Sequence, residues 1–80
     1  MKLPRNLSAR ELVTSLKQYG YLPVRQEASH LRLTTQTNGE HHVTIPMHNP
    51  LKPGTLNNIL KSIAEHIGVS REELLKQLFS

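Results

Sequence analysis

The 80-residue sequence contains no cysteine and no aspartate, and glutamates supply all six of its acidic side chains. Without cysteine, neither disulfides nor a thiolate zinc site can stabilise the fold, so the core must come from aliphatic side chains. The lack of cysteine also fits a reducing compartment. Because most glutamates fall on first helical turns or outer helix faces, a two-metal nuclease or a carboxylate-pair hydrolase is not expected.

Long hydrophobic runs and phosphate-binding glycine motifs are missing as well. No apolar stretch approaches the roughly 20 residues of a transmembrane helix, and residues 1–6 lack the apolar segment of a signal peptide. We therefore expect a cytoplasmic protein without membrane association. The sequence has no glycine-rich phosphate loop and no Gly-x-Ser-x-Gly motif. At this length we expect a single domain over residues 1–80.

The net charge of +4 lies in the N-terminal part of the chain. Residues 1–34 contain six lysines and arginines against two glutamates, whereas residues 35–80 contain four of each. This excess favours a polyanionic partner such as nucleic acid. The alternative is an ordinary solubilising surface, and charge alone does not decide between the two.

Helix signals lie at both ends of the chain. A capping box, Ser-Ala-Arg-Glu, occupies residues 8–11, and the helix that it begins should end at Gly20. A second helix should follow a loop over residues 46–54, with Thr55 as its N-cap. A second capping box at residues 70–73 indicates a short last helix.

Three strands are predicted between the first two helices, at residues 21–25, 31–35 and 42–45. Asn38-Gly39 is a strong hairpin signal between the second and the third. Because Pro23 cannot donate a hydrogen bond to the middle of a ladder, the first strand should be an edge strand or bulged. The expected fold class is α+β: helix, three-stranded antiparallel sheet, helix and short C-terminal helix, with helices covering one sheet face.

The other face of the sheet should stay open and polar. In the second strand Leu31 and Leu33 alternate with polar residues, so the leucines should face the core and the polar side chains the opposite side. The third strand alternates in the same way. The open face is therefore expected to carry His30, Arg32, Thr34, His42 and Thr44.

His30 is the residue on this face with the most useful chemistry. Imidazoles titrate at about pH 6.5 and so accept or donate a proton at neutral pH. The nearby Arg25 and Arg32 can stabilise charge on a phosphate. This set suffices for metal-independent cleavage of RNA, in which the 2′-hydroxyl is an internal nucleophile that needs a base and the leaving oxygen needs an acid. No cofactor is expected.

A histidine metal site is an alternative use of the imidazoles. His41 and His42 are consecutive, so on a strand they point to opposite faces and cannot both bind one ion there. A set of His30, His42 and His48 remains geometrically possible, although solvated or hydrogen-bonded histidines are the commoner case.

Several motifs occur in a distinctive order: a capped helix ending at Gly20, Ser29-His30 entering a strand, Val43-Thr44-Ile45-Pro46 followed by His48, and Lys52-Pro53-Gly54-Thr55-Leu56 leading into Ile59-Leu60. In this combination the sequence resembles the HicA-type toxins, the mRNA interferases of HicA–HicB toxin–antitoxin modules, over nearly its whole length. The resemblance implies a fold similar to a double-stranded-RNA-binding domain.

The resemblance also implies roles for individual residues. His30 matches the catalytic histidine of the family's Gly-Ser-His motif and Ser29 matches the serine, whereas Ala28 stands in place of the glycine. If that glycine serves a positive φ or the close approach of a phosphate, alanine would cost about 1 kcal/mol or crowd the substrate. From their positions near His30, and not from the resemblance, Arg25 and Arg32 are expected to bind phosphate, and Ser29 to orient the RNA backbone or the imidazole.

The implied function is a toxin of a type II toxin–antitoxin module that degrades mRNA as a metal-independent endoribonuclease. Its expected partners are mRNA and a HicB-type antitoxin covering the His30 face, with operator DNA bound only through the antitoxin. Glu27 adds a negative charge where RNA should bind, and Ala28 replaces the family's glycine. Both departures leave open a non-catalytic RNA-binding or antitoxin-binding module with the same fold. A third alternative is an interaction domain whose basic face binds an acidic protein.

Overall fold

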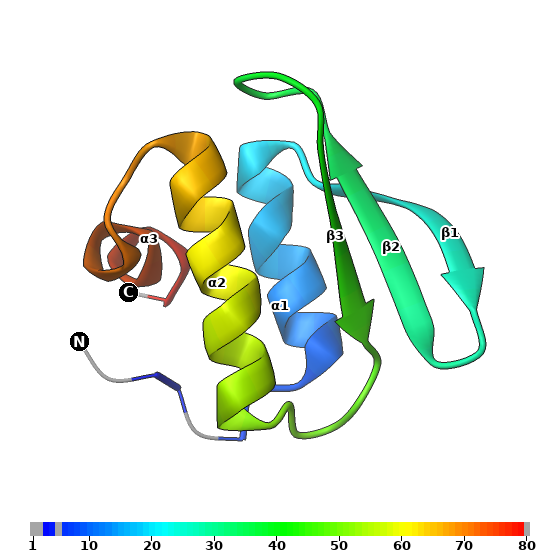
Figure 1. Ribbon diagram of the computed structural model, residues 1–80. Coiled ribbons are helices and arrows are strands. Elements are labelled where there is room, and N and C mark those ends of the chain that lie inside the picture. The colour runs from blue at the N-terminus through cyan, green and yellow to red at the C-terminus, as the bar shows by residue number, and fades with distance from the viewer. Residues whose placement is uncertain (1–2, 5, 80) are drawn as a thin grey trace.

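The computed structural model describes residues 3–4 and 6–79 and has three helices packed on one side of a three-stranded sheet (Figure 1). This confirms the predicted α+β class and is consistent with the arrangement of a double-stranded-RNA-binding domain. The elements follow in the order α1 (Ala9–Leu16), the 3₁₀ turn η1 (Lys17–Tyr19), β1 (Leu22–Glu27), β2 (His30–Thr35), β3 (His41–Pro46), α2 (Pro53–Ile67) and α3 (Arg71–Phe79).

The predicted capping box begins α1. The Ser8 hydroxyl accepts a hydrogen bond from the backbone N–H of Glu11 at 3.1 Å, and the Glu11 carboxylate accepts one from the Ser8 N–H at 3.3 Å. After Leu16 the helix tightens into the 3₁₀ turn η1, and this helical segment ends at Gly20. The φ of Gly20 is +79°, a left-handed conformation that glycine adopts without strain. The expected end of this first helical segment is confirmed.

The predicted start of α2 is wrong. We expected Thr55 to be the N-cap, but the helix begins at Pro53, after Lys52 in an extended conformation. Proline suits the first helical position because the N–H that it lacks would have no helical partner there and its φ is already helical. Thr55 therefore lies inside the first turn. At α3 the predicted cap is present, since the Ser70 hydroxyl accepts a hydrogen bond from the Glu73 N–H at 3.0 Å.

The sheet has the order β1-β2-β3, with both pairs antiparallel. β1 is an edge strand, and its register with β2 shifts between Pro23 and Arg25, so both expectations for this strand are confirmed. Asn38 and Gly39 have φ values of +59° and +98° in the loop that joins β2 to β3. β2 and β3 extend slightly beyond the predicted ranges, whereas β1 begins one residue later and ends two residues later than predicted.

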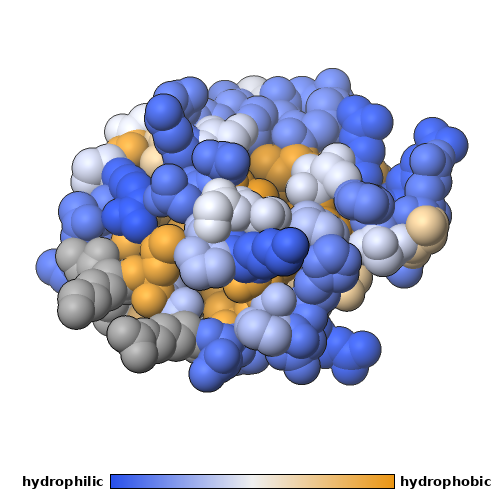
Figure 2. All heavy atoms as spheres, turned by 60° about the horizontal axis from the view of Figure 1, so that its bottom comes forward, coloured by the Kyte–Doolittle hydropathy of each residue, from blue (hydrophilic) through white to orange (hydrophobic). Residues whose placement is uncertain are grey.

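The core lies between the inner face of the sheet and the helices. Leu33, Val43 and Ile45 are buried on that face, where they meet the apolar sides of α1 and α2. Seen from the bottom of Figure 1, hydrophobic atoms show mainly in the recesses between hydrophilic ones (Figure 2). Within the described residues, no helix has the length and apolar character needed to cross a membrane.

Candidate functional site

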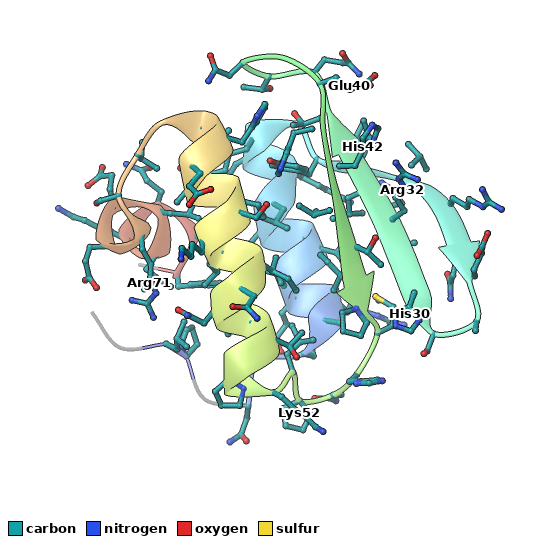
Figure 3. The ribbon with its side chains drawn as sticks, in the orientation of Figure 1. His30, Arg32, Glu40, His42, Lys52 and Arg71 are labelled. Carbon is teal, nitrogen blue, oxygen red and sulfur yellow. The ribbon has the colours of Figure 1, made fainter. Side chains whose placement is uncertain are left out.

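His30 is the first residue of β2 and is exposed on the open face of the sheet. It lies opposite Glu27 of β1 and Pro46 of β3. Figure 3 shows it at the lower end of the sheet, with Arg32 further along the same strand. No residue in the described part of the chain forms a hydrogen bond with its ring, so the protein leaves both ring nitrogens free to bond to a ligand.

The turn before His30 contains a strained residue. Ala28 has a φ of +52° and is the first of the two residues that connect Glu27 to His30. Two-residue hairpin turns often have glycine at this position because a left-handed φ costs other residues about 1–2 kcal/mol. The chain thus makes the turn that a glycine would favour, with alanine in its place. Ser29 joins the turn to the end of β3, since its carbonyl accepts a hydrogen bond from the Met47 N–H at 2.6 Å.

A hollow of about 240 Å³ lies on the open face around His30. Three of the four predicted site residues line it, whereas Ser29 does not, and Glu27 and Thr44 complete the lining. Thr44 was expected on this face from the alternation of β3. The sequence indicates only the negative charge of Glu27, because its position opposite His30 depends on the register between β1 and β2. The lining residues are Arg25, Glu27, His30, Arg32 and Thr44.

The charges in the hollow are partly compensated. Arg25 and Arg32 are directly opposite each other in the β1–β2 register, an arrangement that is unfavourable without an anion between or beside them. Arg25 forms an ion pair with Glu27, and about two thirds of each side chain is exposed (67% and 66%), so the pair contributes little to stability. Arg32 forms no ion pair with any described residue. It is therefore the more available guanidinium for an anionic ligand.

The other end of the open face holds a separate polar network. Nδ1 of His42 lies 2.6 Å from the Thr34 hydroxyl, and its Nε2 lies 3.3 Å from the Glu40 carboxylate. Hydrogen bonds from Gln36 and then His42, together with the charge of His42, lower the pKa of Glu40. Because Thr34, the partner of His42, is four residues along β2 from His30, the backbone positions of the two histidines lie about 13 Å apart along the strand direction. A metal ion held jointly by them is not compatible with this spacing.

His41 takes no part in the open face. Its Nδ1 lies 2.7 Å from the hydroxyl of the buried Tyr21, its Nε2 lies 3.3 Å from the Ser62 hydroxyl, and its ring stacks on His66 with centroids 4.4 Å apart. The expectation that His41 and His42 point to opposite faces is confirmed. Burial, followed by the charges of His66 and His42, lowers the pKa of His41, and burial raises the pKa of Tyr21 to about 12.

This cluster of Tyr21, His41 and His66 was not predicted from the sequence, because it depends on the packing of α2 against the β2–β3 loop. No group of three or more His, Cys, Asp or Glu residues within the described ranges 3–4 and 6–79 is placed to hold a metal ion.

Comparison with known proteins assigns the family. The sequence model of the family described as the HicA toxin of bacterial toxin–antitoxin systems matches residues 9–64, from the start of α1 to the last turn of α2. No curated protein and no solved structure gives a significant match. The matched segment is more than half of the chain and contains the whole His30 hollow, whereas α3 lies outside it. The chain belongs to the HicA family of bacterial toxins.

Proposed function

We propose that this toxin is a metal-independent endoribonuclease that cleaves mRNA, with His30 as a catalytic acid or base. The observation that carries the proposal is an exposed imidazole that no described residue engages in a hydrogen bond, placed in one hollow with two guanidinium groups. Imidazole can transfer protons at neutral pH, and guanidinium groups bind phosphate in a bidentate manner. Family membership supports the toxin role, and these side chains support RNA as its target.

The hollow offers a position for each part of a phosphodiester. Arg32, which has no ion pair among the described residues, would bind the non-bridging oxygens of the scissile phosphate and stabilise the charge that develops on them. Arg25 would add a second positive charge beside it. Ser29, one residue before His30 in the turn, would orient the RNA backbone. His30 would then lie within reach of the 2′-hydroxyl or of the leaving oxygen.

The same face would be the surface that its partners cover. A HicB-type antitoxin that masks the hollow would prevent RNA from reaching His30, and acidic side chains on the antitoxin would complement the basic N-terminal half of the chain. Operator DNA would be bound through the antitoxin. The site of action would be the cytoplasm, where mRNA is present.

A second candidate function is favoured by two features of the turn. Ala28 is strained where the family has glycine, and Glu27 puts a carboxylate in the hollow. Both features would suit a relative that has lost cleavage and retains binding to RNA or to the antitoxin. Such a protein would bind RNA and leave it intact.

Controlled expression of the wild type and of His30→Ala, with RNA integrity followed in the same cells, separates these functions. We expect growth arrest and mRNA fragmentation with the wild type alone. His42→Ala is the matched control, because it removes an exposed imidazole from the far end of the same face and should leave fragmentation intact. Growth arrest by His30→Ala would refute the catalytic assignment. RNA binding without fragmentation by the wild type would support the non-catalytic module.

A further inference from the structure

We infer that Glu27 is the second proton-transfer group of the site and acts with His30 across the β1–β2 hairpin. The inference rests on the proposed ribonuclease function and deepens it. It assigns Glu27 a catalytic role, whereas a carboxylate that acted by its charge alone would only oppose RNA binding.

Cleavage of RNA by its own 2′-hydroxyl needs two proton transfers at once. One group removes the proton of the 2′-hydroxyl, and another gives a proton to the departing 5′-oxygen. Among the five residues that line the hollow, the two arginines stay protonated and the threonine hydroxyl does not titrate. Glu27 and His30 are the two lining residues whose side chains can act as a general acid or a general base.

The register places these two groups on either side of one position. Glu27 ends β1, His30 begins β2, and they are directly opposite each other. Side chains of such a pair project from the same sheet face with Cβ atoms about 4.5–5.5 Å apart. The two-residue turn fixes this spacing, because Ala28 and Ser29 alone connect them. A phosphate lying over the pair would have a carboxylate on one side and an imidazole on the other.

Arg25 holds the Glu27 carboxylate on the open face. Their ion pair joins two residues of β1 that project on the same side, and both side chains remain about two thirds exposed. The carboxylate is therefore oriented by a neighbour and still accessible to RNA. Arg32 stands opposite Arg25 and supplies the charge that an approaching phosphate needs.

The reaction balances with these two groups. The Glu27 carboxylate takes the proton of the 2′-hydroxyl as the 2′-oxygen bonds to phosphorus. The His30 imidazolium gives a proton to the 5′-oxygen as its bond to phosphorus breaks. The products are a 2′,3′-cyclic phosphate on one fragment and a 5′-hydroxyl on the other. Glu27 and His30 then return to their starting states by exchanging protons with water.

Glu27→Gln distinguishes a catalytic carboxylate from a merely repulsive one, because the two roles predict changes of opposite sign. A purely electrostatic Glu27 would oppose RNA, so its neutralisation would free Arg25, tighten binding and speed cleavage. A catalytic Glu27 predicts that single-turnover cleavage of an RNA oligonucleotide slows at least about 100-fold. Binding of an oligonucleotide with a 2′-deoxy group at the cleavage position should stay equal or become tighter.

Two further variants complete the test. Glu40→Gln makes the same change at the other end of the open face and should leave the cleavage rate unchanged. Glu27→Asp keeps a carboxylate and should cleave at least about 10-fold faster than Glu27→Gln. Circular dichroism checks that each variant is folded.

The results of these experiments distinguish the role of Glu27 from the ribonuclease function on which it rests. If His30→Ala abolishes cleavage and Glu27→Gln cleaves as fast as the wild type or faster, the inference is overturned and the ribonuclease stands. Equal rates for Glu27→Asp and Glu27→Gln would also overturn it. If the wild type cleaves no RNA, both proposals fall.

Discussion

Replacing Ala28 by glycine should stabilise the protein. Ala28 has a φ of +52° in the turn between β1 and β2, where the absence of a side chain would remove the steric conflict between Cβ and the backbone. Glycine substitutions usually destabilise proteins, because glycine makes the unfolded chain more flexible. An increase in stability would therefore report directly on the conformation of this residue.

The expected magnitude follows from two opposing terms. Relief of the left-handed strain contributes about 1–2 kcal/mol, and the greater entropy of the unfolded chain with glycine removes about 0.4–1 kcal/mol. The net gain in the free energy of unfolding is about 0.5–1 kcal/mol. With an unfolding entropy of roughly 2.1 cal/mol/K per residue, a chain of this length should gain about 3–6 °C in Tm.

Thermal and urea denaturation of the wild type and Ala28→Gly measure this difference. Gly68→Ala is the matched control, because Gly68 has a φ of +86° and a Cβ at that position would meet no atom within 4 Å. Gly68→Ala is the opposite substitution at a positive φ and introduces no clash, so it should lower the free energy of unfolding by about 0.5–1 kcal/mol. A lower stability of Ala28→Gly, with Gly68→Ala also destabilised, would refute the assignment of strain to Ala28.

Three further predictions concern the structural elements that support the site. Gly20→Ala should lower the free energy of unfolding by about 2 kcal/mol or more, because its Cβ would lie 2.9 Å from the hydroxyl oxygens of Thr35 and Thr37 at a φ of +79°; an unchanged urea midpoint would contradict this packing. His66→Ala should cost about 1–2 kcal/mol by removing the bonds from its Nε2 to two carbonyls of the β2–β3 loop, each at 2.9 Å. Amide hydrogen exchange in that loop should accelerate in His66→Ala, and unchanged protection would show that His66 does not hold the loop in place. The free energy of unfolding should decrease as the pH falls from the ordinary histidine pKa of 6.5 towards the lowered pKa of His41, because the unfolded state binds the proton more readily. The urea midpoint measured against pH tests this, and His41→Gln, if it responds as strongly as the wild type, would exclude His41 as the cause.

The alternation of apolar and polar residues was enough to predict the open face. Leu33 and Val43 are buried, while His30 and Arg32 are exposed, because a strand with one covered face has a period of two residues. The bulge followed from Pro23, which cannot complete a ladder. Such predictions depend on neighbouring residues alone.

The start of α2 and the composition of the site needed more than local patterns. A proline such as Pro53 can indicate either of two structures from the sequence alone. Inside a helix or strand it interrupts regular structure, whereas at the first helical position, which Pro53 occupies, it favours the helix. The position of Glu27 opposite His30 depends on the length of a turn whose first residue is an alanine at positive φ. Alanine does not signal such a conformation, so the sequence indicated the charge of Glu27 and not its place beside His30.

Incubation of purified protein with an RNA oligonucleotide in the presence of a chelator tests the central claim most directly. The account predicts that the wild type cleaves the RNA without a divalent metal, and that folded His30→Ala binds the same RNA and leaves it intact. Cleavage by His30→Ala at the wild-type rate, or cleavage by the wild type that stops on chelation, would contradict it.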